Sequence, residues 1–108
     1  MTFYFWIDDE RPIPENIIRY SIDNKVSMVQ CVTFDEAVSY FTKFVTSDDD
    51  YIIDFDHDLG EGKSGYDFAK WLLENEVRPE SFHVHSMNPV GAKNIYQLLT
   101  HYGWHYIV

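Results

Sequence analysis

Five short apolar segments alternate along the chain with four segments whose apolar residues recur at helical spacing. The apolar segments cover residues 3–7, 26–32, 51–55, 82–85 and 104–108, and each has the length of a strand buried in a sheet. Strands that alternate with helices through short connections favour a parallel sheet with helices on both faces. We therefore expect an α/β, three-layer, doubly wound fold around a five-stranded parallel sheet in the order 2-1-3-4-5.

Polar residues mark the expected starts of three helices, because a side-chain oxygen can accept the free N–H groups of a first helical turn. A fourth, shorter helix follows Pro14, which suits a first turn. The capping residues and their partners are Thr33 with Glu36, Ser64 with Asp67, and Asn88 with Pro89 at the first helical position.

The composition predicts a single domain over residues 1–108, since 45% of the residues are apolar and 18% are aromatic. Cys31 is the only cysteine, so no internal disulfide can form. No apolar run approaches the roughly 20 residues of a membrane span, and the N-terminus lacks the basic start of a signal peptide. These features predict a cytoplasmic protein. The net charge of −10 disfavours broad nucleic-acid binding, which depends on Lys and Arg contacts to phosphates.

Acidic residues follow two of the expected strands directly. Asp8 and Asp9 end the first strand, and Asp56 and Asp58 follow the third. In a parallel sheet these ends share one edge, which is where such folds bind ligands. Crowded carboxylates favour a hard cation, so we expect Mg²⁺ or Mn²⁺ on Asp9 and Asp56, with Asp8 acting directly or through water and Asp58 as a further candidate. The alternative is an exposed acidic loop.

Histidines at the same edge could move protons. His57 lies between two acids, which favours its charged form and suits a proton donor. His85 is close to the end of the fourth strand and is expected to face the site, whereas His83 is expected to be a buried, hydrogen-bonded core residue. Asp54 points to the same side of its strand as Asp56 but lies further down. The spacing of these residues does not fit a structural zinc site.

Anion donors are expected beside the acids. The start of the last helix offers free backbone N–H groups and a partial positive charge, which suit a phosphate. A cation site next to phosphate donors favours phosphoryl chemistry. The candidate phosphate-binding residues are Arg11, Ser86, Asn88 and Lys93.

Four motifs in order, spread over nearly the whole chain, resemble the cyclic-phosphate processing receiver-like domain family, an atypical branch of the response-regulator receiver fold. The motifs are DDERP at 8–12, FDHDLG at 55–60, GYD at 65–67 and HSMNPVG at 85–91. The resemblance implies a flavodoxin-like fold and the processing of cyclic phosphate ends, on RNA or on ADP-ribose products, in RNA repair. It also implies residue roles: metal on Asp8, Asp9 and Asp56, with His57, Asp58 and His85 as the residues that distinguish this branch.

Residues 104–108 contain no lysine where ordinary receivers carry one, and the expected elements include no fifth helix. Both departures weigh against phosphorelay signalling. The favoured hypothesis is an enzyme: a metal-dependent phosphoesterase, with Asp56, His57, Asp58 and His85 as its catalytic candidates, acting on a cyclic phosphate or a nucleotide or RNA phosphate end. One alternative is a receiver-like phosphoacceptor, modified at Asp56, or a non-catalytic binding module. Another is an acidic interaction protein that mimics nucleic acid.

Overall fold

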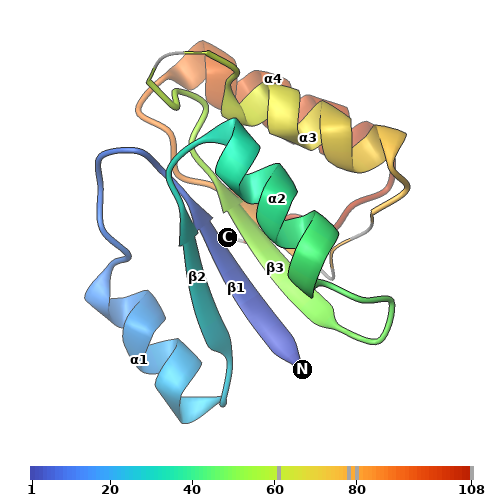
Figure 1. Cartoon of the computed structure of the whole chain (residues 1–108). Helices are drawn as coiled ribbons and strands as arrows, with labels where there is room; N and C mark the ends of the chain where they lie inside the picture. The colour runs from blue at the N-terminus through green and yellow to red at the C-terminus, as the bar shows by residue number, and fades with distance from the viewer. Residues whose placement is uncertain (61, 78, 80, 108) are drawn as a thin grey trace.

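The structure, a computed structural model, describes residues 1–60, 62–77, 79 and 81–107. Within these residues, four parallel strands alternate with four helices, and the sheet order is β2-β1-β3-β4 (Figure 1). The order confirms the predicted positions of the first four strands. In chain order the elements are β1 (Thr2–Ile7), α1 (Glu15–Asp23), β2 (Ser27–Cys31), α2 (Phe34–Phe44), β3 (Asp50–Phe55), α3 (Gly65–Glu74), β4 (Ser81–Val84) and α4 (Pro89–His101).

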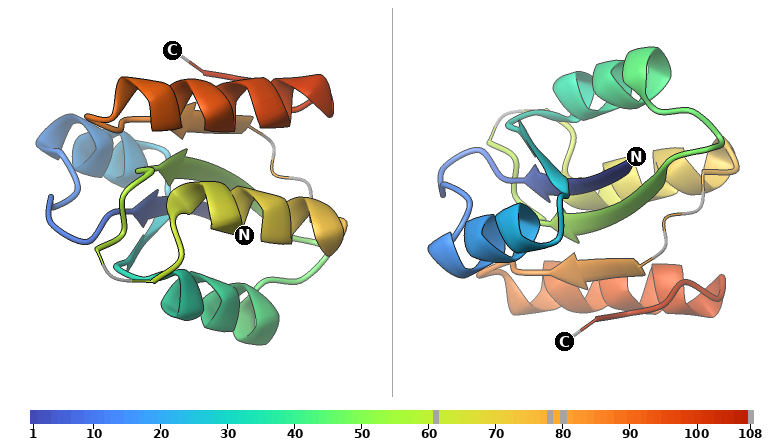
Figure 2. Two further views of the ribbon diagram at one scale, coloured as in Figure 1. Left: turned by 90° about the horizontal axis from the view of Figure 1, so that it is seen from above. Right: turned by 90° about the horizontal axis from the view of Figure 1, so that it is seen from below.

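The sheet is covered on both faces, as the alternation predicts. Alternate residues of β1 point to opposite sides, so Phe5 packs in a large core with Phe41 of α2 and Phe68 of α3. Trp6 points the other way, into a smaller cluster where Ile17 of α1 packs. Figure 1 shows α2 and α3 in front of the sheet, and the two views of Figure 2 show α4 beside β4.

Strand register brings three chain segments to the same level. Ile7 pairs with Phe55, and Phe55 pairs with Val84. The residues that follow these three partners therefore leave the sheet side by side at its carboxyl edge. The ladder continues one step beyond the strands, because the N–H of Asp56 donates to Ile7 (2.9 Å) and the N–H of His85 donates to Phe55 (2.9 Å).

The predicted fifth strand is wrong for the described residues. Tyr106 forms a single parallel bridge with Phe82, at the outer edge of β4, with the Phe82 backbone bonded to His105 and Ile107. The segment thus lies where a fifth strand would, but pairing extends over one residue. The last residue of the prediction, 108, lies outside the described residues.

The predicted caps explain where three helices begin. Thr33 accepts the N–H of Glu36 at the start of α2 (3.0 Å), and Asn88 accepts the N–H of Gly91 at the start of α4 (3.0 Å). Ser64 forms a complete capping box with Asp67 at α3. Before α1, Pro14 is the cap residue itself rather than part of the first turn. None of the helices in the described ranges is long and apolar enough to cross a membrane.

The packing of the core predicts an unreactive thiol at Cys31, which lies fully buried at the end of β2. Burial raises the pKa of its thiol to about 12, with a smaller effect from Glu36. Since the thiolate is the reactive form, we expect negligible labelling by Ellman's reagent at pH 8 in the native protein and full labelling in guanidinium chloride. Rapid stoichiometric labelling of the native protein would contradict this packing.

Candidate functional site

Asp8, Asp56 and His85 meet at the carboxyl edge of the sheet, each directly after one of three neighbouring strands. One carboxylate oxygen from each acid and one ring nitrogen of His85 lie within 4.8 Å of one another, so the three could hold a metal ion. Asp8 is fully buried and Asp56 is 6% exposed. We call these three residues the metal cluster.

The buried carboxylate of Asp8 makes four polar contacts. Its Oδ1 accepts the backbone N–H groups of Glu10 (2.8 Å) and Arg11 (2.9 Å). Its Oδ2 accepts Nε of Arg11 (3.0 Å) and lies 3.0 Å from Nε2 of His85. Burial opposes ionisation, but these hydrogen bonds and the Arg11 charge outweigh it and lower the pKa of Asp8. Asp8 is therefore a carboxylate at neutral pH.

Arg11 bridges two strands through its guanidinium group. Besides Asp8, it reaches Oδ2 of Asp56 with Nη2 at 3.3 Å. A positive charge thus already lies between the two acids, at the point where their repulsion is greatest. Of the predicted phosphate-binding residues, Arg11 is the one that directly contacts two of the predicted metal ligands.

A cavity of about 390 Å³, which we call the rim cavity, opens beside the metal cluster. Its acidic walls and single guanidinium leave an excess of negative charge, which suits a hard cation. Asp9 and Asp58 line this cavity but are not among the three residues of the metal cluster, and metal binding by Asp9 stays a prediction. The lining residues are Asp9, Glu10, Arg11, Asp56, Asp58, Gly60 and Met87.

His57 lies against the first turn of α4. A Cβ on Gly91 would come within 2.3 Å of the His57 ring, so the glycine makes room for this contact. Asp58 also contacts the ring, with its Oδ1 3.0 Å from Nδ1. The side chain of His57 is 23% exposed, and its role as a proton donor remains a prediction.

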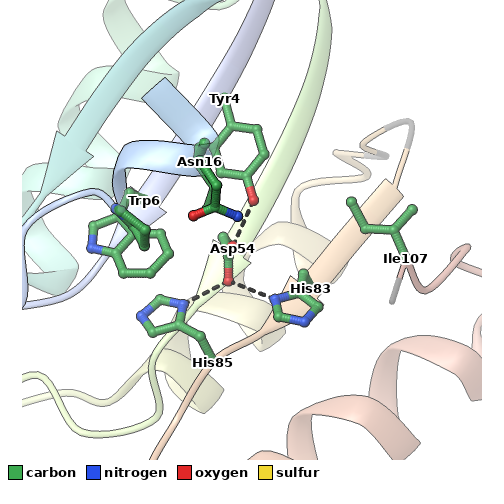
Figure 3. Close-up of a pocket in the computed structure, with 9 residues that line it drawn as sticks. Tyr4, Trp6, Asn16, Asp54, His83, His85 and Ile107 are labelled. Carbon is green, nitrogen blue, oxygen red and sulfur yellow. Dashed lines mark hydrogen bonds and ion pairs between the residues drawn. The ribbon is translucent and has the colours of Figure 1, made fainter. Parts of the chain in front are cut away.

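A second network lies one step further down the sheet, on the face that α1 covers (Figure 3). Asp54 is 1% exposed, and its Oδ1 lies 2.6 Å from Nδ1 of His85 and 3.1 Å from Nδ1 of His83. Its Oδ2 accepts the hydroxyl of Tyr4 at 2.6 Å. His85 thus contacts a carboxylate through each ring nitrogen, Asp8 on one side and Asp54 on the other.

The environment of Asp54 keeps it charged despite its burial. Desolvation opposes ionisation, but the contacts from His83, His85 and Tyr4 together lower the pKa of Asp54 to about 2. The same contact with Asp54 raises the pKa of His83 against the opposing effect of burial. Burial and the Asp54 charge also raise the pKa of Tyr4, which therefore remains a hydrogen-bond donor.

His85 is fixed in orientation as well as in its contacts. Its ring stacks on Trp6 with centroids 3.7 Å apart and an interplanar angle of 5°. The indole is fixed in turn, because its Nε1 donates to the carbonyl of Arg11 (2.9 Å). His85 faces the candidate site, as the sequence predicts. His83 is hydrogen-bonded, but with a side chain 31% exposed it is only partly buried.

The other predicted phosphate-binding residues lie around the start of α4. Ser86 accepts the N–H of Asn88 (3.1 Å), and Asn88 caps Gly91. Both side chains thus satisfy the backbone of this turn, and phosphate binding by them stays a prediction. Lys93 is exposed on α4 and is not among the described residues that line the rim cavity.

The sequence did not lead us to expect a polar network around Asp54 and Tyr4. The available signal was alternation: Tyr4, Trp6 and Asp54 occupy one face of neighbouring strands, opposite the large aromatic core. A polar pair at interior strand positions on a buried face requires partners, and His83 pairs directly with Asp54 in register.

The parallel doubly wound sheet, with its acidic cluster at the carboxyl edge, defines a receiver-like α/β domain. The family model of the cyclic-phosphate processing receiver domain matches residues 3–101. The chain therefore belongs to this family. No curated protein is significantly similar to it in sequence.

Solved structures show the same fold at low identity. The chain is similar to the signal receiver domain of a Luxo repressor protein from Vibrio parahaemolyticus, with 18% identity, a TM-score of 0.68, and 96% of this chain and 74% of that one covered. It is also similar to the response regulator TrrA from Thermotoga maritima in complex with Mg²⁺–BeF, with 16% identity, a TM-score of 0.67, and coverages of 100% and 86%. A third similar structure is a fusion to a yeast Spc42 coiled coil, with 17% identity and a TM-score of 0.65. The match covers 97% of this chain and 66% of the fusion protein, which is longer.

The network predicts a large effect of removing one hydroxyl. The Tyr4→Phe variant leaves Asp54 charged and buried but removes the hydroxyl that donates to its Oδ2. We therefore expect the free energy of unfolding to fall by about 1.5–3 kcal/mol. Tyr102→Phe, at an exposed position, should change it by less than about 0.5 kcal/mol. Urea unfolding curves measure both, and equal stability of the two variants would contradict the role of the Tyr4 hydroxyl.

Proposed function

We propose that the chain is a divalent-metal-dependent phosphoesterase that hydrolyses a cyclic phosphate, on a nucleotide or at an RNA end. The observation that carries the proposal is the metal cluster, in which two carboxylates and an imidazole converge within 4.8 Å beside an acidic cavity. Membership of the cyclic-phosphate processing receiver family supports the substrate class.

The donor set fits a hard cation such as Mg²⁺ or Mn²⁺. Carboxylate oxygens are the preferred ligands of both ions, and Mn²⁺ also accepts imidazole nitrogen. In the proposal Asp8, Asp56 and His85 hold the metal, while Asp9 and Asp58 add negative charge around it. Once bound, the metal supplies Lewis-acid polarisation of the phosphate and lowers the pKa of water.

The side chains of the chain itself supply the remaining roles. Arg11, already aimed at the cluster by two carboxylates, binds a phosphate oxygen. Hydrolysis adds water across one P–O bond: the water oxygen joins phosphorus and its proton passes to solvent, while the departing ribose oxygen takes a proton. His57 supplies that proton and regains one from solvent, and Asp58 orients its ring through the contact with Nδ1.

The proposal predicts turnover of 2′,3′-cyclic nucleotides with Mg²⁺ or Mn²⁺ and none after chelation. Asp56→Asn should lower kcat/KM by at least about a hundredfold, because a metal ligand and its charge are lost. Asp48→Asn removes the same charge from an exposed turn at the opposite end of the sheet and should match the wild type. Absence of turnover with either metal across all four cyclic nucleotides would contradict the proposal.

Metal binding can be measured apart from catalysis. We expect Mn²⁺ titration calorimetry to give one site per chain, with affinity weakened about 10- to 100-fold in Asp8→Asn and retained in Asp48→Asn. Equal affinities in these two variants would place the metal elsewhere.

A receiver-like phosphoacceptor is the second candidate, because Asp56 follows β3 and lines an open cavity in a fold shared with receivers. Incubation with acetyl phosphate and Mg²⁺ distinguishes the two. Under the phosphoesterase proposal the intact mass of the protein stays unchanged, whereas a stable phosphoryl adduct that is absent from Asp56→Asn would favour the phosphoacceptor.

A further inference from the structure

A second cavity, of about 370 Å³, lies on the α1 face of the sheet, and we call it the sheet-face pocket (Figure 3). Its size falls within the range of small-molecule sites. One wall is formed by Asp54 with Tyr4, His83 and His85. Apolar surface comes from Trp6, Ile17 and Ile107. Neither the metal cluster nor the rim cavity accounts for this pocket.

Some polar groups of the pocket are already hydrogen-bonded within the protein, and others remain able to bind a ligand. Both oxygens of Asp54 are already engaged: Oδ2 accepts the Tyr4 hydroxyl, and Oδ1 contacts Nδ1 of His83 and of His85. His83 contacts Asp54 through Nδ1, which leaves Nε2 for a ligand. Asn16, which lines the pocket together with Tyr4 and Asp54, has no hydrogen-bond partner for its amide among the described residues.

These properties select a class of ligand. No Lys or Arg lines the pocket within the described residues, so a phosphate would find no balancing charge there. A sugar would leave hydroxyl groups unpaired against the indole and the aliphatic side chains. A neutral heteroaromatic ring, with flat apolar faces and a few hydrogen-bonding atoms at its edge, matches both the aromatic walls and the sparse polar groups.

The pocket adjoins the metal cluster through a shared residue. His85 lines the pocket, while its Nε2 faces Asp8 of the cluster. Asp54 and Asp56 are two residues apart and point to the same side of the sheet, which separates their positions by about 6.6 Å along the strand direction. A nucleoside cyclic phosphate has a comparable separation between its phosphate and its base.

We propose that the sheet-face pocket binds the nucleobase of the substrate, so that a nucleoside cyclic phosphate lies with its base in this pocket beside His83 and its phosphate at the metal cluster. The proposal rests on the proposed function for the phosphate, but binding of a base to the pocket can be tested without turnover or metal.

The direct test titrates adenosine and uridine, at millimolar concentration, into the metal-free wild-type protein while NMR spectra are recorded. We expect shifts of the Trp6 indole N–H and of the His83 ring signals, and little change at the Asp9 and Asp58 amides. The exposed α1 substitution Asn16→Trp should fill the mouth of the pocket and abolish these shifts. Asn94→Trp, at an exposed position of α4, is the matched control and should retain them.

Kinetics give the second readout. For a cyclic nucleotide, Asn16→Trp should raise KM about tenfold with kcat nearly unchanged, because only binding of the base is lost. A ribose cyclic phosphate that lacks a base should be hydrolysed equally by wild type and variant. Nucleosides that shift no pocket signal would overturn the base site even if cyclic phosphates are hydrolysed. Pocket shifts without any turnover would support the base site and contradict the phosphoesterase.

Discussion

Two buried carboxylates, Asp8 and Asp54, share the imidazole of His85 between them. Burying either carboxylate without a partner would cost several kcal/mol, and this requirement shapes the surrounding structure. Arg11 and two backbone N–H groups complete the shell of Asp8, while Tyr4 and His83 complete that of Asp54. Stacking on Trp6 then holds the shared ring in one plane. The geometry of the candidate site and the stability of the fold therefore depend on the same contacts.

The carboxyl edge of the sheet also shows how a protein of net charge −10 could bind the phosphate of the proposed function. Asp8, Asp9, Glu10, Asp56 and Asp58 lie together at the carboxyl edge. Among the residues that line the rim cavity there, Arg11 alone carries positive charge. A divalent cation would complete this balance and reverse the local potential toward an anionic substrate. Below it, the sheet-face pocket is largely apolar, and no Lys or Arg is among the described residues that line it. The two cavities thus suit the two halves of a nucleotide, with His85 between them.

The sequence predicts the edge of the sheet well, because the strands end in acids and parallel register aligns their ends. Asp8 and Asp56 meet there, and Asn88 and Ser64 cap helices as their spacing requires. The Tyr4–Asp54–His83 network was harder to predict, since it depends on cross-strand register rather than on local pattern. Likewise the apolar segment near Tyr106 has strand character, but only its contact with Phe82 could show that pairing stops after one residue. His57 faces α4 because Gly91 makes room for it, a contact that no spacing rule contains.

A crystal soaked with Mn²⁺ and a 2′,3′-cyclic nucleotide tests the central claim most directly, with anomalous scattering used to locate the metal. The account predicts one manganese peak within coordinating distance of Asp8 and Asp56, with the cyclic phosphate beside it. A manganese peak away from the metal cluster, or a nucleotide bound far from that cluster, would contradict the account.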